Sequence, residues 1–93
     1  MNVDTQKFSI SGRLDAVSAP EWEAKLLPLA DAPGEVVLDL TDLEYISSAG
    51  LRIILMLAKR LQAKGHQLSI TGMNDNVHHV FEMSGFLQII KCV

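Results

Sequence analysis

The sequence predicts an α/β domain in which a mixed, mostly parallel β-sheet packs against α-helices. Two observations predict this fold class. Segments with apolar residues at every second position alternate along the chain with segments of helical spacing, and Gly, Pro and Asn residues separate these segments at regular intervals. Such an order of strands and helices is typical of parallel or mixed sheets. Because the chain has 93 residues, we expect residues 1–93 to form a single domain.

The first third of the chain predicts a strand and then a helix. Apolar and polar residues alternate over residues 7–12, which predicts a strand with one buried face, and residues 12–15 predict its end and a turn. Ser18 can cap a helix, and Glu21 three positions later completes a capping box. Pro28 should end or kink that helix. The apolar residues at helical spacing on its buried face are Trp22, Leu26 and Leu29.

The middle third predicts a central strand and the longest helix. Residues 35–40 are apolar almost throughout, which predicts a central strand covered on both faces. Residues 51–64 have helical spacing, and Gly65 suits the position just after a helix. The apolar stripe of this helix comprises Leu51, Ile54, Leu55, Ala58 and Leu61.

The last third predicts two further strands with a short helix between them. Residues 67–72 alternate again and predict one strand, and residues 86–90 predict a short last one. The helix between them ends before Gly85. Its candidate N-caps are Asn74, Asp75 and Asn76, and its apolar residues are Val77, Val80 and Phe81.

Charge and composition exclude several classes of function. The net charge is -3 at pH 7 and no basic stretch occurs, so neither nucleic acid nor an anionic membrane surface is an expected partner. The longest apolar run, residues 53–58, is far shorter than the roughly 20 residues that span a bilayer. The first residues do not match a secretory signal, and the single cysteine, Cys92, suits a reducing compartment. We expect a cytoplasmic protein without membrane insertion.

The most informative stretch is the junction between the central strand and the longest helix, where residues 47–50 are Ser-Ser-Ala-Gly. A helix start carries unpaired N–H groups and a partial positive charge, so it favours an anion such as a phosphorylated serine. Ser47 or Ser48 can equally serve only as the N-cap. Gly50 lowers helix stability relative to alanine, which indicates a close approach or tight packing at that position.

At these residues the chain resembles the STAS domain, which occurs in bacterial anti-sigma factor antagonists and at the cytoplasmic end of sulphate transporters. The resemblance covers nearly the whole chain and implies a mixed sheet packed against helices. Four motifs carry it, in the family's order: Gly12-Arg13-Leu14-Asp15, Val37-Leu38-Asp39-Leu40, Tyr45-Ile46-Ser47-Ser48-Ala49-Gly50-Leu51 and Met83-Ser84-Gly85-Phe86.

The resemblance implies a regulatory protein that binds other proteins and uses no cofactor. Stand-alone family members bind an anti-sigma factor that is also a serine kinase; phosphorylation breaks the complex, and a serine phosphatase restores it. The implied partner-binding surface includes Asp15, for which a turn or cap role is the alternative. The remaining residues of this surface form the start of the long helix: Ser47, Ser48, Ala49, Gly50, Leu51 and Arg52.

The phosphate acceptor departs from the family pattern. That pattern is Asp-Ser-Ser/Thr-Gly, with the acceptor hydroxyl directly before the glycine. Here Ala49 occupies the acceptor position and Ser47 replaces the aspartate. We therefore expect phosphorylation at Ser48 in preference to Ser47. The alternative is a STAS scaffold subunit of a signalling or transport complex that is not phosphorylated.

Three further expectations concern assembly and chemistry. Only one strand is evident before Asp15, whereas many family members start with a hairpin, and an exposed sheet edge would allow a homodimer. His78 and Glu82 share a helical face, but a zinc site normally takes at least three protein ligands, so we expect no metal site. A serine hydrolase needs Gly-x-Ser-x-Gly, and residues 47–50 lack its first glycine, so we expect no enzymatic activity.

Overall fold

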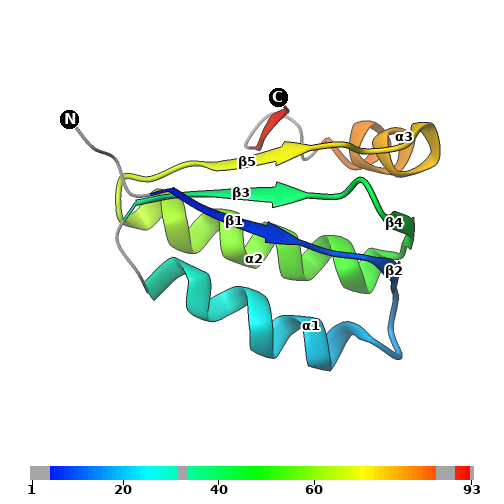
Figure 1. The fold of residues 1–93 in the computed structure, drawn as a ribbon, viewed down its shortest axis with the longest axis horizontal. Coiled ribbons are helices and arrows are strands. Elements are labelled where there is room, and N and C mark those ends of the chain that lie inside the picture. The colour runs from blue at the N-terminus through cyan, green and yellow to red at the C-terminus, as the bar shows by residue number, and fades with distance from the viewer. Residues whose placement is uncertain (1–4, 32–33, 86–89, 93) are drawn as a thin grey trace.

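The computed structural model describes residues 5–31, 34–85 and 90–92, which form an α/β fold (Figure 1). The strands are β1 (Thr5–Ser9), β2 (Gly12–Leu14), β3 (Glu35–Asp39), β4 (Leu43–Ile46), β5 (Leu68–Thr71) and β6 (Lys91–Cys92). The helices are α1 (Ala19–Leu26), the 3-10 helix η1 (Leu27–Asp31), α2 (Ser48–Ala63) and α3 (Asp75–Ser84). One sheet has the order β1-β3-β5-β6, a second pairs β2 with β4, and every pairing described is parallel. The predicted α/β class with a mostly parallel sheet is confirmed.

β1 continues into β2 and β3 continues into β4, and these two stretches of chain run side by side. β1 pairs in register with β3, with Thr5 opposite Glu35 and Ser9 opposite Asp39. Further along both stretches, β2 pairs with β4 in the smaller sheet. The two stretches therefore carry the chain from the main sheet to the end of the molecule where α1 and α2 begin (Figure 1).

One expectation about the strands is wrong, and one strand was not expected. Gly12–Leu14 is a strand and not a turn, so two strands precede Asp15 instead of one. In addition, no pattern predicted Leu43–Ile46. Its two apolar ends are buried while Glu44 and Tyr45 between them are exposed, so the segment lacks an alternation of period two.

Helices cover one face of the four-stranded sheet. In β3, Val36 and Leu38 are buried, whereas Val37 and its polar neighbours on the other face are only half-buried. α1 and α2 lie side by side beneath the strands, and α3 follows β5 next to β4 (Figure 1). The expectation that residues 35–40 are covered on both faces is therefore wrong, because Val37 adds apolar character to the segment without being buried.

The helix after β2 ends as predicted and begins differently. α1 gives way to η1 one residue before Pro28. The predicted capping box is wrong, because Ser18 has helical backbone angles and its side chain makes no cap hydrogen bond. The Ser18 hydroxyl instead donates to the carbonyl oxygen of Arg13 (2.7 Å) and accepts from the N–H of Asp15 (3.1 Å).

The longest helix starts earlier than predicted and buries a wider face. α2 begins at Ser48, and Gly65 follows its C-terminus with the positive φ (80°) that favours glycine. The buried face differs from the predicted stripe: Leu55 is only half-buried, while Ile53 and Leu57 are buried. The buried face is wider because α2 packs against α1 as well as against the sheet. The buried residues of α2 are Gly50, Leu51, Ile53, Ile54, Leu57, Ala58 and Leu61.

The short helix α3 confirms the predicted caps. The Asn74 side chain accepts a hydrogen bond from the N–H of Val77 (2.8 Å), and Gly85 adopts the left-handed conformation that ends the helix. The predicted last strand falls mostly on residues 86–89, which lie outside the described residues. Among the helices of the described ranges, none has the length and hydropathy that crossing a bilayer requires.

Candidate partner-binding surface

A backbone hydrogen bond joins the start of α2 to β2. Ser47 has an extended backbone, and its N–H donates to the carbonyl oxygen of Leu14 (2.9 Å). Its side-chain oxygen accepts a hydrogen bond from the N–H of Gly50 (3.4 Å). Ser47 is therefore the N-cap of α2, one of the two roles that the sequence left open for the serine pair.

Gly50 packs against the chain itself. A Cβ atom at this position would overlap Leu14 in β2 and crowd Ile46 in β4. The tight packing indicated by the sequence is thus a contact between α2 and the strands β2 and β4. Gly50 and Leu51 are both buried, so they shape the surface from beneath and expose little area themselves.

Three residues in the first turns of α2 reach the surface. Ser48 and Arg52 are exposed and lie four residues apart, so they share one face of the helix. Ala49 is half-buried and packs against the core. Of the two adjacent serines, the one whose hydroxyl does not cap α2 is therefore also the more exposed.

Asp15 orders the loop between β2 and α1. Its carboxylate accepts hydrogen bonds from the N–H groups of Val17 (3.0 Å) and Ser18 (3.1 Å), and from Nε of Arg13 (3.3 Å). The bond from Ser18 contributes most to holding the pKa of Asp15 below its usual value, although partial desolvation acts in the opposite direction. Asp15 therefore fulfils the turn role that the sequence offered as the alternative to partner contact.

Two large apolar side chains, one in this loop and one in the neighbouring strand β4, face solvent. Val17 is 91% exposed and Tyr45 is 42% exposed. The guanidinium carbon of Arg13 lies 4.3 Å from the centre of the Tyr45 ring, a cation–π contact that joins β2 to β4. Tyr45 begins one of the four sequence motifs but was not among the candidate site residues, and Val17 was not singled out at all. A β-branched apolar residue inside a turn, as at Val17, is a usable signal.

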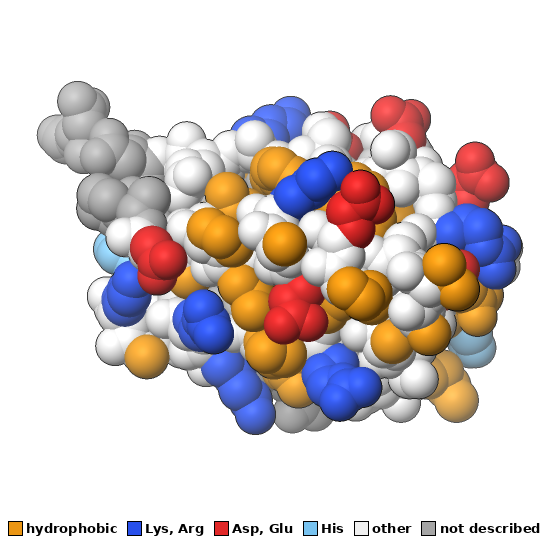
Figure 2. Space-filling model, turned by 90° about the horizontal axis from the view of Figure 1, so that it is seen from below, with side chains coloured by type: hydrophobic (Ala, Val, Ile, Leu, Met, Phe, Trp, Pro, Cys, Tyr) orange, Lys and Arg blue, Asp and Glu red, His pale blue; other side chains and the backbone are white. Residues whose placement is uncertain are grey.

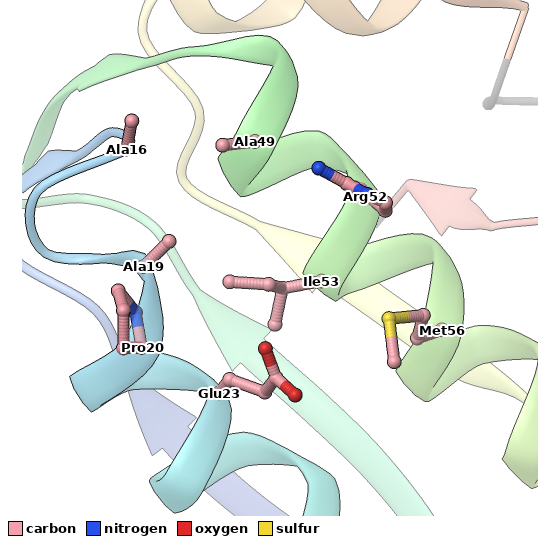
Figure 3. A pocket seen from close by; sticks show the side chains of 8 residues that line it. All are labelled: Ala16, Ala19, Pro20, Glu23, Ala49, Arg52, Ile53 and Met56. Carbon is pink, nitrogen blue, oxygen red and sulfur yellow. The ribbon is translucent and has the colours of Figure 1, made fainter.

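A groove of about 450 Å³ separates α1 from α2 at the end that carries Ala49 (Figure 3). We call it the α1–α2 groove. The carboxylate of Glu23 is directed across it from α1, and the side chain of Arg52 lies along α2 toward Ala49 (Figure 3). Its apolar lining residues are Ala16, Ala19, Pro20, Ala49, Ile53 and Met56.

The face of the molecule formed by α1 and α2 carries hydrophobic side chains in its middle, interspersed with acidic and basic ones (Figure 2). Non-obligate interfaces have about the same apolar fraction as the remaining protein surface, so this composition fits a protein–protein contact but does not by itself identify one. The exposed end of α2 and the loop ordered by Asp15 adjoin this face, so a partner can cover both together.

The histidines do not assemble a metal centre in the part of the chain that the structure describes. Within residues 5–31, 34–85 and 90–92, no group of three His, Cys, Asp or Glu side chains is placed to hold an ion. His66 accepts a hydrogen bond from the N–H of Gly34 (3.4 Å), and its Nδ1 lies 3.5 Å from the carboxylate of Glu35. This histidine links the start of β3 to the segment before β5.

The order of strands and helices, the site at the start of α2 and the sequence motifs agree with one family. The model of the STAS domain family matches residues 3–93. The chain belongs to the STAS domain family. In this STAS domain, the Gly-x-Leu-Asp motif forms β2 and the ordered loop, and the Ser-Ser-Ala-Gly motif forms the start of α2.

Two curated relatives and one solved structure are similar to this STAS domain. It is 44% identical over 82 residues to the "Putative anti-sigma factor antagonist BtrV" of Bordetella bronchiseptica, which covers 86% of this chain and 70% of BtrV. It is 28% identical over 96 residues to the anti-sigma-B factor antagonist of Bacillus subtilis, covering 97% of this chain and 88% of that protein. The fold is similar to the anti-sigma factor antagonist SpoIIAA in its unphosphorylated form, with a TM-score of 0.73 at 15% identity, covering 100% of this chain and 84% of SpoIIAA.

Proposed function

We propose that this STAS domain is an anti-sigma factor antagonist, which binds an anti-sigma factor and thereby frees the sigma factor that the latter holds. The observation that carries the proposal is the 44% identity to BtrV over 86% of the chain. The match to the anti-sigma-B factor antagonist over 97% of the chain supports the same class. In this proposal residues 1–93 act as one cytoplasmic domain, with no catalytic activity or cofactor of their own.

The proposed docking surface is the start of α2 together with the loop that Asp15 orders. Ser48 and Arg52 are exposed there, Ala49 is half-buried between them, and Val17 projects from the loop. Small side chains allow the backbone of a partner to approach closely, and covering exposed apolar groups such as Val17 releases water. Because hydrogen bonds already order the loop, little conformational entropy is lost when a partner binds it.

Phosphorylation of Ser48 is the proposed switch. Ser48 is exposed, whereas the hydroxyl of Ser47 serves as the N-cap acceptor. A phosphate adds about -1.5 to -2 charges at neutral pH, and a close interface would have to desolvate them. A loss of about 3 kcal/mol weakens binding roughly a hundredfold. In this proposal the anti-sigma factor is the serine kinase, and a serine phosphatase removes the phosphate.

The switch requires no rearrangement of the fold. SpoIIAA has been solved in both its unphosphorylated and its phosphorylated form, and this chain matches them with TM-scores of 0.73 and 0.72. Because the same fold is matched in both forms, a local effect of charge at the docking surface is sufficient for the proposed switch. The phosphate would then act on the partner's affinity and not on the stability of the STAS domain.

Ala49 favours a second candidate function. The residue directly before Gly50 carries the acceptor hydroxyl in the family pattern, and here it is a methyl group, half-buried against the core. In this alternative the chain is a STAS scaffold subunit of a signalling or transport complex, permanently in the state that corresponds to the unphosphorylated form.

Titration calorimetry with each purified anti-sigma factor of the source organism tests the proposed function. Binding that displaces the sigma factor supports it, and failure with all of them overturns it. The switch is tested by adding ATP to the complex and mapping phosphate by mass spectrometry. Phosphate that is lost in Ser48→Ala and retained in the matched Ser47→Ala supports the switch at Ser48. Binding without phosphate, together with phosphate-sensitive binding in Ala49→Ser, favours the scaffold.

A further inference from the structure

We propose that the α1–α2 groove receives a lysine or arginine side chain of the anti-sigma factor, with its apolar stem in the groove and its charged end at Glu23. The inference rests on the proposed function and specifies the chemistry of the partner at that surface. It extends the contact from the start of α2 along the first turns of α1, where the sequence motifs point to no site.

The lining of the groove suits the stem of a long side chain. Ile53, on the floor, is 3% exposed, and Met56 is half-buried beside it. The walls on the α1 side are short side chains, Ala16 in the loop before α1 and Ala19 at its first position, which leave the space between the helices open. The methylene groups of lysine and arginine pack well along apolar surface while their charged ends stay in water.

Glu23 supplies the charge that selects a basic group. Its carboxylate is exposed and directed across the apolar groove (Figure 3). Within the described residues, no lysine, arginine or histidine forms an ion pair with Glu23. Among the described residues that line the groove, one is basic, Arg52, and its side chain lies along α2 toward Ala49. An unpaired carboxylate on an apolar surface is complementary to a partner that brings the opposite charge.

The groove is continuous with the proposed docking surface. Ala49 and Arg52 belong to both, since they lie at the start of α2 and line the groove. A partner that covers both the start of α2 and the loop that Asp15 orders would also cover the mouth of the groove, because Ala16 in that loop and Ala49 in α2 line it. For this reason the occupant is the same anti-sigma factor and not a separate ligand.

Charge reversal at Glu23 tests the electrostatic part of the inference. Glu23→Lys should weaken binding of the anti-sigma factor identified above by about tenfold or more, because a like charge then meets the partner's basic group. The matched control is Glu21→Lys, an exposed acid two residues earlier on α1 that does not line the groove. It should change the affinity by less than about threefold, as expected for a charge outside the contact. Salt should slow association less in Glu23→Gln than in the wild type.

Filling the groove tests the steric part. Ala16→Leu adds bulk at an exposed wall position and should weaken binding by about tenfold or more, because the stem is then excluded. Ala63→Leu, at an exposed position in the last turn of α2, is the matched control and should bind as the wild type does. Thermal unfolding of each variant checks that the fold is intact.

The outcomes separate the two proposals. If Glu23→Lys and Ala16→Leu bind as the wild type does while Ser48→Glu binds poorly, the groove is not occupied, and the proposed function stands. If the wild type binds no anti-sigma factor, both proposals are overturned. If the variants change the mass of the free chain in sedimentation and leave partner binding intact, the groove is a contact between copies, and the inference is wrong.

Discussion

A Cβ atom on Gly50 would lie 2.6 Å from the carbonyl oxygen of Leu14, the same oxygen that accepts the hydrogen bond from Ser47. β2 and α2 are therefore in contact at one backbone atom, the carbonyl oxygen of Leu14. The helix cannot move away from Leu14 without weakening the hydrogen bond that fixes its N-cap residue, Ser47. The position of the proposed docking surface depends on this contact.

Gly50→Ala should therefore destabilise the domain, although alanine favours helices by about 1 kcal/mol over glycine. We expect a loss of about 2 kcal/mol or more, because the new methyl group would overlap the backbone carbonyl oxygen and the Cγ atom of Leu14, neither of which is the free end of a flexible side chain. Urea denaturation measures it. Ser48→Ala, in the same helical turn but exposed, is the control and should shift the midpoint little. Equal midpoints for Gly50→Ala and the wild type would contradict the packing argument.

The two side-chain N-caps should differ in strength. Asn74 accepts a hydrogen bond from Val77 at 2.8 Å and donates another to the carbonyl oxygen of Leu43 (3.1 Å), so it also joins α3 to β4. Ser47 accepts one bond, from Gly50 at 3.4 Å. We expect Asn74→Ala to cost about 2 kcal/mol and Ser47→Ala about 0.5 kcal/mol. Thermal unfolding of both variants decides the order, and the reverse order would contradict it.

Stability should fall in acid through Asp39. Its carboxylate accepts hydrogen bonds from the hydroxyl (2.6 Å) and the N–H (3.0 Å) of Thr41, and the hydroxyl contributes most to lowering its pKa from the usual 3.8. A folded pKa below the unfolded value means that the unfolded chain takes up the proton first. The stabilisation is complete well above pH 3.8 and is lost as the pH falls through the lower, folded pKa.

Asp39→Asn tests this linkage. Between about pH 5 and pH 2, the free energy of unfolding should depend less steeply on pH in the variant than in the wild type. Urea titrations at several pH values measure the slope. Asp15→Asn should also flatten the curve, because the pKa of Asp15 is lowered too, chiefly by the hydrogen bond from Ser18. Parallel curves for the wild type and both variants would show that neither carboxylate contributes.

Val17 should matter for binding and not for folding. It is 91% exposed at the loop of the proposed docking surface, so Val17→Asp removes no buried contact. We expect its affinity for the anti-sigma factor to fall by about tenfold or more with an unchanged melting temperature. Met83, which is 75% exposed on α3, provides the control, and Met83→Asp should bind normally. Equal losses in both variants would indicate a nonspecific effect of the added charge.

The sequence predicts best those structural features whose interacting residues lie within one turn or strand of each other. The caps of α3, at Asn74 and Gly85, act within one helical turn, and the pattern located both. The predicted capping box at Ser18 does not form, because the Ser18 hydroxyl donates to the backbone carbonyl oxygen of Arg13. That oxygen lies near Ser18 because of the direction in which β2 leads into the loop. β4 escaped prediction because Glu44 and Tyr45, between its two buried ends, are both exposed, so its sequence shows no alternation of period two.

The candidate site also contains residues that the sequence could locate and residues that only the fold brings together. Residues 47–52 are adjacent in the sequence, so their motif marks the start of α2 before any fold is known. The position of Glu23 and Ala16 opposite Ala49 depends on the packing of α1 against α2, which no local pattern encodes. Asp15 was found as a motif residue, while its hydrogen bonds to the following turn became evident only from the folded loop.

The parallel pairing of every described strand has a consequence for how this chain acquires its shape. Thr5 meets Glu35, and Val36 meets Leu68, so each of these sheet contacts must first close a loop of roughly thirty residues. No described strand pair is a hairpin that could nucleate locally, and chains dominated by distant contacts fold more slowly than helical bundles of equal size. During synthesis, β1 cannot pair until β3 has left the ribosome. Until then the backbone N–H and C=O groups of β1 form hydrogen bonds with water.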